Sequence, residues 1–201
     1  MKKKLFLAVL LLVSSTTFAQ NTSTSQIEKQ NTVSSEGFRA SLLRSDLDAK
    51  IKIEYAGKTF TGENENIDTA LGVAVGYASL PIQQLGWTAN FAYMKLKADD
   101  TSVKMGRVDA NLAYAFNSLI NIKGGLNVSK LSVEDGTIDY KPAVGLQLGF
   151  GLQFTKNFGL DVSYVQMRNT ADISADISAE DDTADATVTL DGSEIALTGT
   201  F

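Results

Sequence analysis

Apolar side chains recur at every second position along most of this chain, from Gly37 to the last residue. The segment 70–78 shows the pattern most clearly, because Leu71, Val73 and Val75 alternate with glycine and alanine. Successive side chains of a β-strand point to opposite faces, so this period predicts strands with one apolar face and one small or polar face. Eight segments carry the pattern: 37–45, 70–78, 85–94, 107–116, 120–129, 143–154, 158–167 and about 188–201.

The connections between these segments alternate in length and polarity. Residues 81–84, 117–119 and 155–157 are short enough for tight turns. The other four connections are longer and more polar, at 45–69, 95–104, 131–141 and 168–187. An even number of strands with short turns at one end and long loops at the other is typical of an up-and-down antiparallel barrel.

The outer face decides between a water-soluble barrel and a membrane barrel. The polar face carries mainly Gly, Ala, Ser, Asn and Thr, which fit the narrow interior of an eight-stranded barrel. Aromatic residues gather at the strand ends beside the short turns, where a girdle at a membrane interface would lie: Phe38, Tyr77, Trp87, Tyr114, Phe116, Phe154, Phe158 and Phe201. We therefore predict an all-β fold, an eight-stranded antiparallel up-and-down transmembrane β-barrel. A secreted, water-soluble binding barrel is the alternative.

The first residues are typical of a secretory signal peptide. Three lysines at 2–4 precede the apolar run 5–13, which is too short to cross a bilayer, and small residues stand at Thr17 and Ala19. An N-terminal membrane anchor is the alternative. Loss of these lysines makes the net charge of −5 still more negative, which argues against binding to nucleic acid. We divide the chain into a signal peptide at 1–19, a flexible lead-in at 20–35 and the barrel at 36–201.

The chain contains neither cysteine nor histidine. These absences exclude disulfides, zinc–thiolate sites and Ser-His-Asp triads, and they remove the commonest general base. A hydrolase that works with carboxylates alone needs two converging acids, and Asp109 and Asp161 both belong to the inward face. Pairing with basic residues explains these two acids more simply. We therefore expect neither catalysis nor a cofactor.

Six charged residues belong to the predicted inward face: Arg39, Arg107, Asp109, Lys123, Asp161 and Glu194. Charges in a confined interior are costly unless they are paired, so we expect ion pairs that form a polar plug. A narrow gated channel for ions or small solutes, in which an ion pair exchanges partners, is the alternative.

The loop 168–187 is strongly acidic and repeats Ala-Asp-Ile-Ser at 171–174 and 175–178. Its first acids are spaced as in an EF-hand, but Ile177 stands where glycine is needed and Thr183 where glutamate is needed, so we reject that motif. A looser cluster of oxygen ligands is retained as a candidate site for Ca²⁺ or Mg²⁺: Asp172, Asp176, Glu180, Asp181 and Asp182. A solvated acidic loop is the alternative.

The loop 46–68 contains a second alternating segment. Ile51, Ile53 and Tyr55 alternate with charged residues, and Ala56-Gly57 can turn the chain back into 58–60. This predicts a hairpin that continues the barrel wall outward, with a sheet edge that can accept a partner strand. A surface loop without such a hairpin is the alternative.

The signal peptide, the eight alternating segments, the unequal connections and the terminal aromatic residue resemble the small outer-membrane barrels of Gram-negative bacteria, the OmpA/OmpX-like outer membrane protein beta-barrel group. The resemblance covers 36–201. It implies an outer-membrane monomer with both termini, and hence the aromatic girdle, on the periplasmic side. Its implied partners are membrane lipid and lipopolysaccharide, periplasmic chaperones and the barrel-assembly machinery.

The resemblance also implies a role for the last strand and for the loops. The assembly signal of that group is matched by Ile195, Leu197 and Phe201, whereas Gly199 departs from it, where a bulky or aromatic residue is common. The implied function is structural or adhesion-like, through the loops 46–68 and 168–187.

Overall fold

The computed structural model describes residues 35–55, 57–62, 65–67, 69–98, 101–133, 140–174 and 183–201. The predicted signal peptide, and the lead-in up to residue 34, lie outside these residues. The described residues form ten strands: β1 (Ser35–Tyr55), β2 (Lys58–Thr61), β3 (Glu65–Asn66), β4 (Thr69–Leu80), β5 (Leu85–Ala98), β6 (Thr101–Ala115), β7 (Ile120–Val133), β8 (Tyr140–Thr155), β9 (Phe158–Ser174) and β10 (Thr183–Thr200). They contain no helix long and apolar enough to cross a membrane.

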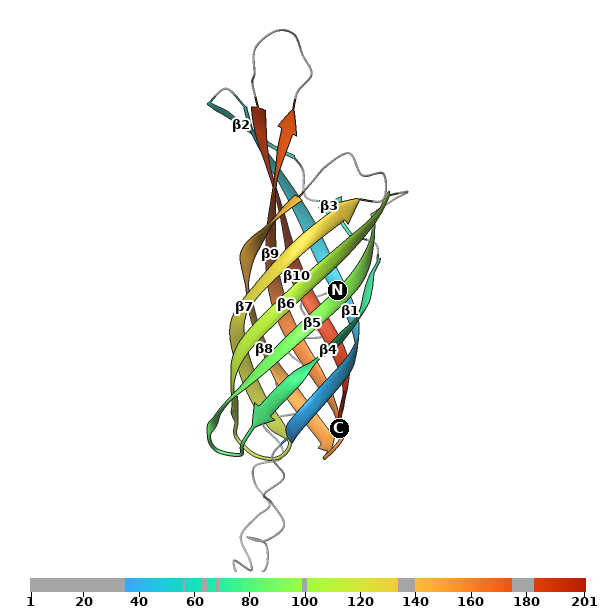
Figure 1. Cartoon of the computed structure of the whole chain (residues 1–201), viewed down its shortest axis with the longest axis vertical. Helices are drawn as coiled ribbons and strands as arrows, with labels where there is room; N and C mark the ends of the chain where they lie inside the picture. The colour runs from blue at the N-terminus through green and yellow to red at the C-terminus, as the bar shows by residue number, and fades with distance from the viewer. Residues whose placement is uncertain are drawn as a thin grey trace, which may run out of the picture. The chain divides into compact units, whose positions relative to one another are not determined.

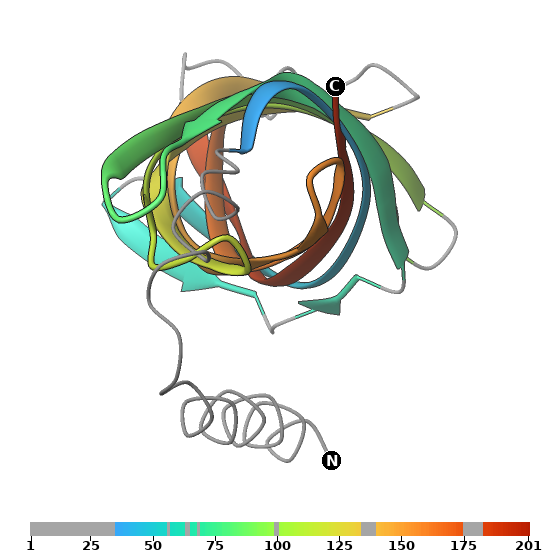
Figure 2. The same ribbon diagram turned by 90° about the horizontal axis from the view of Figure 1, so that it is seen from below.

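The eight long strands, β1 and β4 to β10, close into one antiparallel barrel (Figures 1 and 2). Each pairs with the next along the chain, and β10 returns to β1 in a register that runs from Arg39↔Thr200 to Glu54↔Asp185. The predicted fold class is therefore confirmed. The short strands β2 and β3 pair only with β1 among the described residues.

The three predicted tight turns are confirmed, and they share the lower end of the barrel in Figure 1 with the C-terminus. The turn after β6 is built around Asn117, whose side-chain Oδ1 accepts hydrogen bonds from the backbone N–H groups of Leu119 and Ile120, both at 2.8 Å. An asparagine side chain commonly closes a turn in this way.

The connections at the opposite end, which we call the loop end, are shorter than predicted. The expected loop 95–104 is mostly strand, because β5 and β6 stay paired as far as Ala98↔Thr101. Much of the expected loop 168–187 is likewise strand, since β9 and β10 remain paired to Ser174↔Thr183. The predictions fail here for one reason. Side chains continue to alternate between the two faces, but the apolar residues move from the outward-facing to the inward-facing positions. On β5, Tyr93 faces outward, whereas beyond it Leu96 faces inward and is buried.

The outer wall is apolar and the inner wall is mixed. Large apolar side chains such as Phe91, Val108 and Leu148 are about half exposed or more on the outside. A water-soluble barrel would have the reverse arrangement, so this wall fits a lipid surrounding and contradicts the alternative of a soluble binding barrel. The buried core is the lumen itself.

Candidate functional site: the barrel lumen and the loop end

Five strands carry the six predicted charges into the lumen. Arg39 comes from β1, Arg107 and Asp109 from β6, Lys123 from β7, Asp161 from β9 and Glu194 from β10. Each has a relative exposure of 9 % or less. Their inward direction follows from strand alternation, because their sequence neighbours face the outer wall.

Three of these charges form a cluster around Asp161. Its Oδ2 accepts a hydrogen bond of 2.7 Å from Arg39 Nη2, and its Oδ1 lies 3.4 Å from Lys123 Nζ. The hydroxyl of Thr198 donates a further bond of 3.3 Å to the same Oδ2. The cluster holds two cations and one anion, so it carries one net positive charge.

The other three form a cluster around Arg107. Its Nη2 and Nη1 donate to the two carboxylate oxygens of Glu194 at 2.7 and 2.9 Å. Its Nη2 also donates to Asp109 Oδ2 at 3.1 Å, while its Nε lies 2.8 Å from Asp109 Oδ1. The planar guanidinium suits such a two-pronged contact, which is stronger and more directional than a single ion pair. This cluster carries one net negative charge and so balances the first.

Polar side chains outside the predicted set extend this network. Gln147 Nε2 donates to Asn111 Oδ1 at 2.6 Å, and Asn111 Nδ2 donates to Thr88 Oγ1 at 3.1 Å. Ser45 donates to Glu194 at 3.1 Å. The cavity left among the charges has a volume of only about 20 Å³, close to that of one water. All these residues stand at inward-facing positions of their strands. Strand alternation in the sequence is therefore the signal that could have identified them.

The loop half of the lumen is apolar, so the predicted polar plug occupies only the other half of the lumen. Its centre consists of side chains that are at most 5 % exposed: Leu47, Met94, Leu96, Met105, Leu131, Val165, Met167 and Leu190. Tyr140, at the start of β8, packs against this layer. Leu47, Leu96 and Leu131 fall in predicted loops, whereas Met94, Val165, Met167 and Leu190 fall on the inner face of predicted strands, a face that the prediction treats as polar.

The eight aromatic residues of the predicted girdle lie at the short-turn end. They make several ring contacts there, with centroid distances of 5.5 Å for Phe38–Tyr77, 5.6 Å for Tyr77–Trp87 and 5.2 Å for Tyr114–Phe116. The ring centroids of Phe154 and Phe158 lie 6.3 Å apart.

The last residues complete the barrel seam. Phe201 and Phe38 exchange backbone hydrogen bonds of 2.8 and 3.2 Å, and Ile195, Leu197 and Phe201 are exposed on the outer wall. Gly199 lies against the ring of Phe201, where an added Cβ would stand 3.3 Å from Cζ. The ring of Phe201 therefore covers Gly199, the position at which this sequence departs from the assembly signal of the group.

The loop end carries the second predicted feature, and here the hairpin is confirmed. β1 leaves β4 after Ser45, continues beyond the barrel beside β10, and pairs with β2 from Lys52↔Thr61 to Tyr55↔Lys58. Figure 1 shows this hairpin and the β9–β10 hairpin projecting from the same end. We call β2, β1, β10 and β9 beyond the barrel the projecting sheet.

The candidate metal ligands Asp176, Glu180, Asp181 and Asp182 lie outside the described residues, and so does the side chain of Asp172. The side chains that the structure describes include no group of three acidic residues placed to hold a metal ion. The metal site stays a prediction.

Comparison with solved structures supports the fold. The outer membrane protein OprG from Pseudomonas aeruginosa matches with a TM-score of 0.51 and 14% identity, over 81% of this chain and 95% of that one. Neisserial surface protein A matches with a TM-score of 0.39 and 19% identity, over 82% and 97%. Neither a protein-family model nor a curated protein sequence matches the chain. The predicted resemblance to small outer-membrane barrels is thus confirmed at the level of the fold.

Proposed function

We propose that this protein is an integral outer-membrane barrel that does not conduct and that presents its projecting sheet to a partner at the cell surface. The short-turn end and both termini would face the periplasm, and the loop end the exterior. The proposal includes no catalytic activity and no cofactor, because the chain lacks histidine and the described lumen carboxylates are all engaged in ion pairs.

The single observation that carries the proposal is that side chains close the lumen at two levels. The charge network fills one half, the apolar layer fills the other, and the cavity between the charged groups has room for about one water. An eight-stranded barrel is just wide enough for side chains to fill it. A barrel closed in this way acts through its surfaces.

The projecting sheet offers a defined surface for such contact. Gly62 N–H donates to Ile51 C=O at 2.9 Å, and hydrogen-bonding direction alternates along an antiparallel strand. The N–H groups of Lys58 and Phe60 therefore point to β1, whereas those of Thr59 and Thr61 point to the outer edge of β2. An extended partner strand can pair with this edge.

The experiment removes those two edge donors. We expect Thr59→Pro/Thr61→Pro to lower the adhesion of cells that display the protein to protein-coated surfaces, because proline has no N–H. Thr59→Ala/Thr61→Ala keeps both donors and serves as the matched control. Equal adhesion of the proline and alanine variants would show that the β2 edge is not the contact.

One observation favours the gated channel as a second candidate. The Lys123–Asp161 distance of 3.4 Å is longer than the 2.7 Å of Arg39–Asp161, and Lys123, Asp109 and Asp161 line the same cavity. Movement of Lys123 from Asp161 to Asp109 would rearrange the polar layer. Single-channel recording in planar bilayers decides between the candidates: frequent conductance steps that change in Lys123→Met favour the channel, and a silent bilayer favours the closed barrel.

A further inference from the structure

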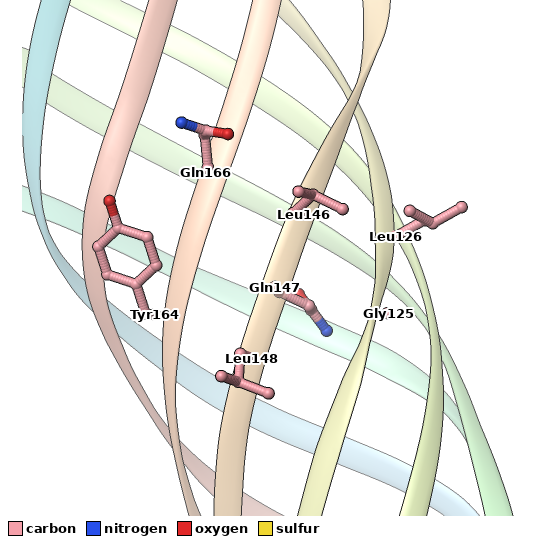
Figure 3. A pocket seen from close by; sticks show the side chains of 7 residues that line it. All are labelled: Gly125, Leu126, Leu146, Gln147, Leu148, Tyr164 and Gln166. Carbon is pink, nitrogen blue, oxygen red and sulfur yellow. The ribbon is translucent and has the colours of Figure 1, made fainter.

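A groove of about 500 Å³ lies on the barrel wall across β7, β8 and β9 (Figure 3). Its outward-facing lining is mostly apolar and consists of Leu126, Leu146, Leu148, Tyr164 and Gln166. A bulge runs beside it, because the β8–β9 pairing shifts between Pro142↔Asn169 and Leu146↔Gln166 and β8 holds one residue more than β9 there. This wall faces the lipid of the proposed membrane. A protein outside the cell therefore meets the projecting sheet and not the groove.

The edge of β2 is the open edge of the projecting sheet among the described residues. All four residues of β2 are exposed, and β2 pairs with β1 alone in the part of the chain that the structure describes. The N–H and C=O groups of Thr59 and Thr61 point away from β1. Such an edge can pair with an extended chain, and an identical edge is one such chain.

Two copies of this edge fit each other in one antiparallel register, centred on Phe60. Thr59 of each copy then lies opposite Thr61 of the other, and the two residues exchange both of their backbone hydrogen bonds. A register centred on Thr59 or Thr61 uses fewer of these groups, because Gly57 turns the chain at a φ of 74° and β2 ends at Thr61. The register centred on Phe60 therefore satisfies the whole edge in both copies.

The side chains also match in this register. Phe60 is 56 % exposed and lies opposite Ile53 within its own hairpin, so the row across the two copies reads Ile53, Phe60, Phe60, Ile53. The two Phe60 residues form a pair without mutual hydrogen bonds, in which opposite side chains lie closest, and aromatic pairs stabilise such positions. Lys58 of each copy lies opposite Gly62 of the other, so no like charges meet.

Antiparallel pairing also fixes the direction of the second copy. The two-fold axis that relates adjacent antiparallel strands stands perpendicular to their sheet and reverses the direction of everything attached to them. β1 runs out of the barrel at the loop end and carries β2 with it (Figure 1). The second barrel therefore points the opposite way. Two barrels in one membrane point the same way, so the second copy must lie in a membrane that faces the first.

We propose that the partner of the projecting sheet is the projecting sheet of a second copy on a neighbouring cell, joined edge to edge through β2. The joined sheet runs β9, β10, β1, β2 and then through the same strands of the second copy in reverse order. A contact of this size is weak by itself, but many copies on two facing cells add their affinities. The inference rests on the proposed function and names its partner, and each barrel stays a single copy within its own membrane.

Disulfide trapping between vesicles tests the register, and it is clean because the chain contains no cysteine. The full chain is reconstituted as Thr59→Cys in one vesicle population and as Thr61→Cys in another. Opposite residues of a hydrogen-bonded pair have Cα atoms about 5.5 Å apart, within the range of a disulfide, whereas the same residue in the two copies lies on a diagonal of about 7–8 Å, outside that range. Mild oxidation of the mixed populations should give a disulfide-linked dimer. Either population alone is the matched control and should give none.

A charge exchange at Phe60 tests the axis without cysteines. Vesicles that carry Phe60→Lys should lose the aggregation that wild-type vesicles show, because two like charges then lie directly opposite each other. Vesicles that carry Phe60→Glu should lose it for the same reason. A mixture of the two should aggregate again, since the opposite residues then carry opposite charges. Heat-modifiable migration in unboiled gels verifies that each variant is folded.

Several results would overturn self-pairing. These are a mixed population without the dimer, a dimer in equal yield from either population alone, or a mixture of the Lys and Glu variants that stays dispersed. The adhesion assay separates this inference from the proposed function when cells settle on supported bilayers that contain the protein or on a coating of other proteins. Adhesion that needs the β2 edge but is equally strong on both would leave the proposed function standing and overturn self-pairing alone. Adhesion that ignores the edge on both would overturn both.

Discussion

Arg107 is the residue whose loss we expect to damage the barrel most, because two carboxylates depend on it. Its side chain is 2 % exposed and bridges Glu194 at 2.7 Å and Asp109 at 2.8 Å. Breaking a buried ion pair by removing one partner costs about 3–5 kcal/mol, mainly because the remaining charge is left buried. Arg107→Met leaves two such charges, so we expect a loss at the upper end of this range.

A variant that removes all three charges separates this cause from a loss of packing. In Arg107→Met/Asp109→Asn/Glu194→Gln no charge of this cluster is left without a partner, and replacement of a whole buried ion-pair group by neutral residues is often close to neutral in stability. The net positive charge of the Asp161 cluster then lacks its counter-charge, so we expect the recovery to be large but incomplete. We expect the triple variant to recover most of the stability that Arg107→Met loses. Arg44→Met, on the exposed outer wall, is the matched control and should change stability by no more than about 0.5 kcal/mol.

The chain has one tryptophan, Trp87, and it lies on the outer wall beside Tyr77. Urea titration of the protein in lipid vesicles, followed by the fluorescence of Trp87, therefore reports removal of the barrel from lipid. The free energy of unfolding then follows from linear extrapolation. A triple variant less stable than Arg107→Met, or a single variant within 1 kcal/mol of wild type, would refute the reasoning that buried charge decides the outcome.

Three further predictions concern packing and closure. Leu47→Ala should lower the free energy of unfolding by about 2–5 kcal/mol in the same titration, because Leu47 is fully buried in the apolar layer. Leu42→Ala, on the outer wall, is the control and should lower it clearly less. Equal losses in the two variants would mean that the apolar layer is not a packed core. Gly145→Ala should destabilise the barrel, because the added Cβ would lie 2.0 Å from the carbonyl oxygen of Gln166. Gly106→Ala should not, because a Cβ at Gly106 would have no atom within 4 Å. A larger loss of stability in Gly106→Ala than in Gly145→Ala in urea titration would contradict the geometry of the β8–β9 bulge. Wild-type protein in planar bilayers should give no large conductance steps, and steps of the size seen with open porins would contradict the closed lumen.

Much of the lumen site was predictable because strand alternation assigns each side chain to a face without further information. The six inward charges were identified in this way, and so was the hairpin at 51–60. The bulge between β8 and β9 was not predictable: β8 has one residue more than β9 between the pairs Pro142↔Asn169 and Leu146↔Gln166, and nothing in the sequence around Gly145 marks which residue is added. A bulge depends on how two whole strands align, and Asn127 holds it from a third strand.

The apolar layer of the lumen shows a different limit. Lys95 and Lys97 on β5 fall in a predicted loop, although they alternate with the buried Leu96 as strictly as any pair in the chain. At the level of Lys95 and Lys97 the outward-facing side chains change from apolar to polar. The apolar residues of the alternating pattern therefore lie on the inner face beyond this level. Sequence shows the change of phase, but only the barrel shows that it coincides on neighbouring strands and fills the lumen.

The sequence by itself therefore determined the number of barrel strands, the face on which each side chain lies and the end at which the chain turns tightly, because all three are local properties of an alternating strand. The tertiary structure alone decided which charges meet. Arg39 and Asp161 stand 122 residues apart and come together only because closure brings β1, β7 and β9 around one narrow lumen. Partner choice depends on the register of every strand between them, and no local pattern carries that information.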